Sequence, residues 1–181
     1  MNETVKKFDL KKELMEWVET VVWAAVMVSL VFTFLGRPIT VSGSSMYPTY
    51  HDKDRVIVSS LFHKPQYGDA VALVPNIQEN IRYIKRVIAT GGQTVDINFE
   101  TGEVTVDGVV LDEPYINEPT YTAEGMEFPA TVPEGHVFVL GDNRNHSKDS
   151  RHSSIGMVDE RQILGRVLVR FFPFNRAGIP H

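Results

Sequence analysis

The longest hydrophobic feature of the chain lies near its N-terminus. Residues 17–35 read WVETVVWAAVMVSLVFTFL, and Glu19 is the only charged side chain among them. About 20 consecutive apolar residues are needed for a helix to cross a bilayer core, so the run predicts one transmembrane helix over residues 17–36. A cleaved signal peptide and a buried core helix are the alternatives, but the run is long for a signal peptide and no Ala-x-Ala stretch follows it.

The basic residues around this run predict its orientation. Four lysines lie in the first twelve residues, whereas Arg37 is the first basic residue after the run. Because cytoplasmic flanks carry the excess of lysine and arginine, we expect a single-pass protein of the cell membrane. Residues 1–16 would be cytoplasmic, 17–36 a signal anchor, and 37–181 an extracytoplasmic domain.

Short apolar or alternating runs, separated by turn residues, follow the predicted anchor. They are residues 55–59, 70–74, 81–89, 94–98, 103–106, 137–140 and 163–171. Asp107-Gly108 between two such runs is a hairpin signal, and beyond residue 40 helical periodicity is limited to one turn near 159–163. The pattern predicts a mainly β domain built on antiparallel sheet.

The composition of the chain argues against several kinds of site and partner. The 181 residues leave room for one anchor and one domain, and there are no cysteines. Disulfides, thiolate metal sites and a cysteine nucleophile are therefore excluded. The six histidines form no recognisable ligand pattern, so we expect neither a metal nor another cofactor. A net charge of -5 argues against nucleic acid as a partner.

A cluster of small residues before a proline is the first candidate site. Residues 42–49 read SGSSMYPT, which allows a tight turn that presents a hydroxyl together with a free backbone N–H. A serine nucleophile with an oxyanion site requires both groups. An ordinary loop explains the same composition.

The second candidate is the lysine in the run over residues 81–89. Strand periodicity places Tyr83, Lys85, Val87 and Ala89 on one face, so that Lys85 has apolar neighbours. Burial among them would lower the pKa of the amine, as a lysine base requires. A solvated lysine on a sheet edge is the alternative. Arg86 would face the other way with a structural role.

The third candidate is a polar run that directly follows the strand predicted over residues 137–140. It supplies short donors and acceptors together with two guanidiniums, at Asp142, Arg144, Ser147, Asp149, Ser150 and Arg151. Asp149 and Arg151 could form an ion pair that fixes the loop. A surface loop without function would also account for its polarity.

In this order behind one apolar segment, the three stretches resemble the bacterial type I signal peptidases in their short, single-anchor form. The serine box matches residues 43–49, the lysine box 83–88, and the third box 141–144, 147 and 149–151. The likeness continues through residues 111–116, 132–136, 155–156 and 163–166. It implies a β fold shared with self-cleaving repressors.

The resemblance also implies the roles of the residues. Ser45 would be the nucleophile and Lys85 the general base, with Ser147 hydrogen-bonded to the amine. Other side chains would brace the loop, namely Asp142, Arg144, Asp149 and Arg151. The enzyme would be a membrane-bound serine endopeptidase that removes signal peptides from exported preproteins after Ala-x-Ala-like residues. Its partners would be those signal peptides and the lipid bilayer.

The chain departs from the family pattern in two places. Residues 89–93 read ATGGQ where the family usually carries a Gly-x-Pro-Gly-Asp turn, so we expect an altered turn with the chemistry retained. Gly43 stands where some members use a serine hydroxyl as an oxyanion donor, which leaves backbone N–H groups for that task. Two other functions stay open: a self-cleaving repressor, which would need a DNA-binding domain, and a non-catalytic anchored β domain.

Overall fold

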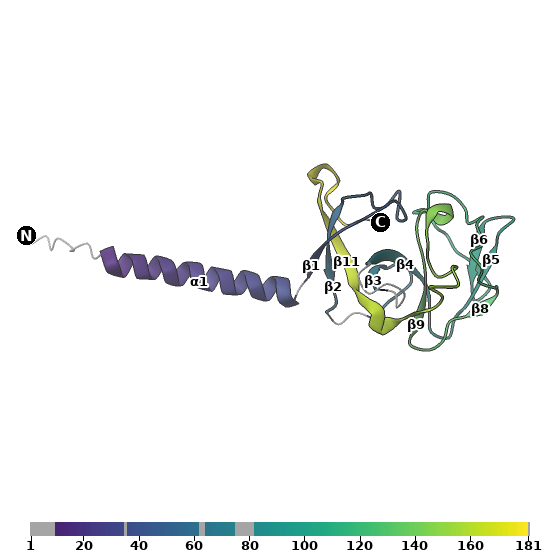
Figure 1. Cartoon of the computed structure of the whole chain (residues 1–181), viewed down its shortest axis with the longest axis horizontal. Coiled ribbons are helices and arrows are strands. Elements are labelled where there is room, and N and C mark those ends of the chain that lie inside the picture. Colours follow the sequence, from purple (N-terminus) through teal and green to yellow (C-terminus); the bar gives the residue numbers. More distant parts are fainter. Residues whose placement is uncertain (1–9, 35, 62–63, 75–81, 181) are drawn as a thin grey trace, which may run out of the picture. The chain divides into compact units, whose positions relative to one another are not determined.

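The chain forms two separate units, Met1–Leu35 and Gly36–His181. The computed structural model describes residues 10–34, 36–61, 64–74 and 82–180. In the first unit, helix α1 spans Leu10–Phe34 (Figure 1). Within the part of the chain that the structure describes, no helix has both the length and the hydropathy needed to cross a membrane. Residue 35 of the predicted 17–36 span lies outside the described residues.

The second unit is built on two antiparallel sheets (Figure 1). The larger has the order β1-β2-β11-β3-β4-β9-β10 and the smaller β7-β6-β5-β8. The strands of the larger sheet are β1 (Arg37–Thr40), β2 (Arg55–Ser59), β3 (Ala70–Leu73), β4 (Tyr83–Thr90), β9 (His136–Leu140), β10 (Val158–Asp159) and β11 (Ile163–Phe172). Those of the smaller sheet are β5 (Thr94–Asn98), β6 (Glu103–Val106), β7 (Val109–Val110) and β8 (Ala130–Thr131).

Burial along the strands explains why these residues form sheets. In β5 and β6 buried and more exposed positions alternate, as expected for sheets with one face on a core. All four residues of β3 are buried because this strand lies in the interior of the larger sheet. Three apolar clusters result, one of which joins β5 and β6 to Phe138 and Leu140 of β9. That shared cluster packs the two sheets together.

All seven predicted strands are present. Each of the seven runs contains a strand, although residue 81 of one run lies outside the described residues. The hairpin at Asp107-Gly108 joins β6 to β7, and both residues have positive φ, as a tight two-residue turn requires. The helical turn appears as a 3-10 turn at Glu160–Gln162. Strands β1, β8 and β10 were not predicted.

The predicted alternation of β4 is wrong at its end. The register pairs Val87 with Val139 and Ala89 with Phe138, so Ile88 is an extra residue in a β-bulge. Since Val139 and Phe138 point to opposite faces of β9, Ala89 lies on the face opposite Val87. Ile88 and Ala89 instead share the cluster that packs the sheets together.

The unusual turn after this bulge is held by a glutamine. Gln93 Oε1 accepts hydrogen bonds from the backbone amide and hydroxyl of Thr90, at 2.9 and 3.2 Å. Gly92 has a φ of +87°, a conformation that favours glycine. The turn leads from the larger sheet into the smaller one and is stabilised by its own polar residues.

Candidate active site

Ser45 and Lys85, which are 40 positions apart in the sequence, meet in the structure. Lys85 Nζ lies 2.6 Å from Ser45 Oγ. The lysine projects from β4, and the serine belongs to the turn between β1 and β2. This separation is within the range over which a base can take a hydroxyl proton directly.

The environment of Lys85 favours its neutral form. Only 2% of the residue is exposed, and it lies opposite Val71 in the register of β3 and β4. Burial lowers the pKa of Lys85 to about 8, while the charges of Asp149 and Asp142 act in the opposite direction. The amine can therefore lose its proton much closer to neutral pH than an exposed lysine.

The turn that carries Ser45 is anchored on both sides. Gly43 has a φ of +85°, and its backbone amide donates to Asp52 Oδ1 at 2.9 Å. Met46 and Tyr50, which follow the serine, are buried in an apolar cluster. Ser45 itself is half-buried, so its hydroxyl is held at the edge of the core.

The polar loop after β9 bonds directly to the backbone of this turn. The backbone N–H of Asn143 donates to the carbonyl of Ser45 at 3.0 Å, and its side-chain Nδ2 donates to the carbonyl of Ser44 at 3.1 Å. Gly141 makes the approach possible, because a Cβ there would lie 2.5 Å from the Ser45 carbonyl oxygen and 2.1 Å from Ser147 Oγ. No residue with a side chain fits that position unless its neighbours move.

The ion pair expected within this loop is present. Arg151 Nε donates to Asp149 Oδ1 at 2.9 Å, and both side chains are fully buried. The same guanidinium donates to the carbonyls of Thr122 and Arg144, at 2.9 and 2.5 Å. Asp149 also accepts from the amide of Gly141. The pair thus fixes the loop backbone from within.

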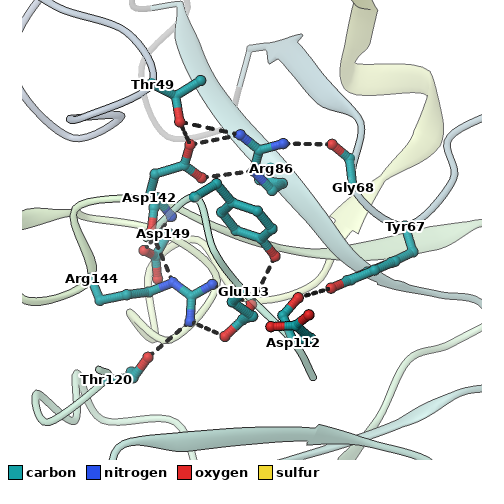
Figure 2. A network of polar contacts seen from close by, with 12 residues as sticks. Thr49, Tyr67, Gly68, Arg86, Asp112, Glu113, Thr120, Asp142, Arg144 and Asp149 are labelled. Carbon is teal, nitrogen blue, oxygen red and sulfur yellow. Dashed lines mark hydrogen bonds and ion pairs between the residues drawn. The ribbon is translucent and has the colours of Figure 1, made fainter. Parts of the chain in front are cut away.

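Asp142 connects this loop to the lysine strand. Its carboxylate accepts from Nε and Nη2 of Arg86, at 2.8 and 2.7 Å, and from the hydroxyl of Thr49 at 2.5 Å (Figure 2). Arg86 is the residue after Lys85, and Thr49 ends the serine turn. One buried carboxylate therefore holds parts of all three candidate stretches.

Arg144 points away from this carboxylate to a different one. Its guanidinium donates to both oxygens of Glu113, at 2.8 and 2.5 Å, and to Thr120 Oγ1 at 3.0 Å (Figure 2). Its Nε donates to the carbonyl of Gly141. Arg144 is completely buried, so Glu113 supplies the negative charge that it requires.

Ser147 is buried in the loop without the predicted contact. Its Oγ has no hydrogen-bond partner among the described residues. The side chain lies beside Gly141, which would otherwise carry a Cβ against it. The structure thus places Ser147 next to the chain that supports Ser45, but not in a hydrogen bond with Lys85.

Sequence reasoning missed four contributors to this site. Asn143 stood inside the third box without an assigned role, and Thr49 ended the serine box in the same way. Glu113 was part of a matching stretch, and Arg86 was considered only structural. No local pattern could have indicated these four residues, because the residues that they contact are remote in the chain. Only the family resemblance pointed to them. Within the described residues, no group of three or more acidic or histidine side chains is arranged to hold a metal ion.

An antiparallel β domain that brings a serine hydroxyl to a buried amine holds the two groups that define the serine peptidases with a lysine base. The chain matches the family model described as signal peptidase, peptidase S26, over residues 14–172. It is 36% identical over 180 residues to signal peptidase I of Bacillus licheniformis, which covers 94% of this chain and 95% of that protein. The chain therefore belongs to the S26 family of signal peptidases.

A second relative agrees with this assignment. Signal peptidase IB of Staphylococcus aureus is 36% identical over 184 residues, covering 92% of this chain and 93% of that protein. Among solved structures, signal peptidase I of Enterococcus faecalis V583 is 36% identical and covers 57% of this chain and 97% of that chain, with a TM-score of 0.47. The family and the peptidase activity predicted from the sequence are confirmed.

Proposed function

We propose that the chain removes signal peptides from exported preproteins, with Ser45 as the nucleophile and Lys85 as the general base. The observation that carries the proposal is the 2.6 Å separation of Ser45 Oγ from an amine that is almost completely buried. A hydroxyl is a weak nucleophile by itself and needs a base that is neutral at the working pH. Burial lowers the pKa of Lys85 to about 8, so a fraction of the amine is neutral near neutral pH and can act as the base.

The reaction proceeds through an acyl-enzyme. Neutral Lys85 takes the proton as Ser45 Oγ attacks the scissile carbonyl, and backbone N–H groups, including that of Ser45, stabilise the oxyanion. The resulting ammonium gives its proton to the leaving amine as the peptide bond breaks. Water, deprotonated by the same amine, then attacks the ester, and Ser45 regains its proton as the signal peptide is released.

The third loop supports these steps from behind. Asp142, Arg144, Asp149 and Arg151 are positioning residues, because their ion pairs hold the backbone that contacts Ser45. Ser147 is proposed to orient the amine of Lys85 when substrate is bound. Its hydroxyl is buried and has no hydrogen-bond partner among the described residues, which supports that role because buried hydroxyls are normally hydrogen-bonded.

The substrate is an extended peptide with small residues one and three positions before the cleavage site. An added strand would direct both side chains to one face, because side chains alternate along a strand. Met46 and Ile84 lie in the same buried apolar cluster, beside Ser45 and Lys85 in the sequence. This apolar environment supports a preference for alanine over charged residues.

Residues 17–36 are proposed to anchor the enzyme in the cell membrane with residues 37–181 outside the cytoplasm. The apolar run and the lysines before it support this topology. Because the chain has no cysteine, Lys7→Cys and Glu100→Cys variants can each be labelled in intact cells with a membrane-impermeant maleimide. Labelling of Glu100→Cys alone is expected, and labelling of Lys7→Cys before lysis would contradict the topology.

The dyad is tested with full-length protein in detergent and a preprotein substrate. Ser45→Ala and Lys85→Met are expected to abolish cleavage while both variants remain folded. Ser42→Ala, which removes an exposed hydroxyl from the same turn, is the matched control and should cleave at the wild-type rate. Full activity in Ser45→Ala would remove the basis of the proposal.

A further inference from the structure

The dyad is flanked by two buried guanidiniums whose carboxylates come from different parts of the chain. Arg86 follows Lys85 on β4 and pairs with Asp142. Arg144 lies in the loop after β9 and pairs with Glu113. In Figure 2 the pair of Arg86 and Asp142 lies above the pair of Arg144 and Glu113. In the sequence, Glu113 lies outside the three candidate stretches.

Glu113 belongs to the segment that leaves the smaller sheet after β7. Its side chain is 6% exposed, and it meets Arg144 in a two-pronged contact. A carboxylate and a guanidinium in this arrangement restrict each other in direction as well as in distance. Together with Thr120 and the carbonyl of Gly141, Glu113 therefore fixes the buried side chain of Arg144.

Tyr115 joins this ion pair to the other one. Its hydroxyl donates to Glu113 Oε1 at 2.8 Å, and its ring centroid is 4.0 Å from the guanidinium carbon of Arg86. Such a distance is well within the range of a cation–π contact. Burial raises the pKa of Tyr115, so its hydroxyl stays protonated and remains a donor.

Each guanidinium is linked to one member of the dyad. Arg86 is bonded through the chain to Lys85. Arg144 follows Asn143, whose amide donates to the carbonyl of Ser45. Glu113 and Tyr115, two residues apart, consequently contact the supports of both the nucleophile and the base.

We propose that Glu113 and Tyr115 are positioning residues that set the separation of Ser45 Oγ from Lys85 Nζ. This inference rests on the proposed dyad. The segment that carries them works as a strut from the smaller sheet to the active site. Loss of the strut leaves Asp142 as the remaining side-chain tie between the two supports. They can then shift relative to each other, which lengthens the contact in the dyad and admits water to the amine.

A role in stability alone makes different predictions from a role in positioning. A stabilising contact, once lost, lowers the unfolding midpoint but leaves the folded molecules with normal turnover. A lost positioning contact lowers kcat with little change in KM, because substrate binding does not depend on it. Hydration of the amine also raises the pKa of Lys85, so the rate should rise at higher pH than in the wild type.

The experiment compares Tyr115→Phe, Tyr115→Leu and Glu113→Gln in full-length enzyme, assayed well below each unfolding midpoint. Tyr115→Phe keeps the ring over Arg86 but loses the bond to Glu113, whereas Tyr115→Leu loses both. We expect kcat to fall about 10-fold in Tyr115→Phe and about 100-fold in Tyr115→Leu, since small displacements of reacting groups have effects of this size. In both variants KM should stay near the wild-type value.

Asp112→Asn is the matched control, because it removes an exposed carboxylate next to Glu113. It should leave kcat and the pH profile unchanged. Wild-type kcat and pH profile in Tyr115→Phe and Tyr115→Leu would overturn the proposal, and these two variants decide it if Glu113→Gln does not fold. An active Ser45→Ala variant would instead show that the dyad assignment has failed.

Discussion

Lys85 lies opposite Val71 in the antiparallel register of β4 and β3, and this pairing buries a lysine among apolar neighbours. A buried ammonium is destabilised relative to the neutral amine, which is why the pKa of Lys85 falls to about 8. Burial therefore disfavours the ammonium form of Lys85 and makes the neutral amine available as a base near neutral pH.

The first prediction concerns the pH dependence of cleavage. If neutral Lys85 is the base, kcat/KM should rise with pH and level off above the pKa of about 8. The rate rises with pH because only the deprotonated amine can accept the serine proton. Initial rates of peptide cleavage in detergent, measured from acidic to alkaline buffers, test this. A rate that falls as pH rises through this range would contradict the assignment.

The second prediction concerns stability. Because the pKa of Lys85 is lowered from its ordinary value of 10.5 to about 8, the unfolded chain binds the proton more strongly than the folded one. Below the folded pKa, burying the charged lysine has its full cost, on the order of a few kcal/mol. Lys85→Met removes that cost and should be inactive but more stable than the wild type at neutral pH.

Denaturant unfolding of both proteins across pH provides the measurement. The advantage of Lys85→Met should shrink as pH rises above about 8 and disappear above about 10.5, where the lysine is neutral in both states. A stability difference that does not change over this window would show that folding does not lower the pKa of Lys85.

The fold could be predicted to the extent that its signals are local. Asp107-Gly108 specifies a hairpin through its own backbone preferences, and alternation identifies most of the strands. Strands β8 and β10 have two residues each, too few to show a pattern, and they form only through pairing with remote strands. The bulge at Ile88 also depends on the partner strand, so period-two reasoning put Ala89 on the wrong face.

The site was predictable as a set of residues but not as a network. Ser45 and Lys85 are brought together by sheet pairing, which no local pattern encodes. Resemblance to a family supplied their identities and that of the third loop. It did not supply the partners of the charges: Glu113 compensates Arg144 from 31 positions away, and Asp142 reaches Arg86 across 56. A buried guanidinium must pair with a carboxylate, and only the folded chain shows which carboxylate lies near it.

The third prediction tests the close approach at Gly141. A methyl group there would lie 2.5 Å from the Ser45 carbonyl and 2.1 Å from Ser147 Oγ, so Gly141→Ala must displace one of them. We expect a stability loss on the order of 1–3 kcal/mol, as for other overpacked sites. Displacement of the serine turn should lower kcat about 100-fold.

Gly135→Ala is the control for this substitution. Gly135 has a φ of +73° and nothing within 4 Å of an added Cβ, so alanine there strains the backbone without a steric contact. It should lower stability by about 1 kcal/mol and leave kcat unchanged. Chemical denaturation and steady-state kinetics separate the two effects. Wild-type kcat in Gly141→Ala would mean that the serine turn tolerates the displacement.

The fourth prediction contrasts two aspartate–arginine pairs. Asp54 is completely buried and accepts from Arg170 at 3.2 Å and from Arg176 at 2.9 Å. Arg170 also donates to the carbonyl of Thr49 at 2.8 Å, which ties the end of the serine turn to β11. Asp54→Asn leaves these arginines without their carboxylate and should cost about 3–5 kcal/mol, as when one partner of a buried ion pair is removed.

The exposed counterpart is the pair of Asp159 with Arg161, in which the arginine side chain is 90% exposed. The pKa of Asp159 is lowered by this contact, but solvent screens a charge on the surface, so Asp159→Asn should leave the unfolding midpoint unchanged. Thermal unfolding of both variants makes the comparison. Because Arg170 also holds Thr49, Asp54→Asn should in addition lower kcat in the folded fraction, whereas Asp159→Asn should not. Equal stability losses in the two variants would show that burial does not determine how much these ion pairs contribute to stability.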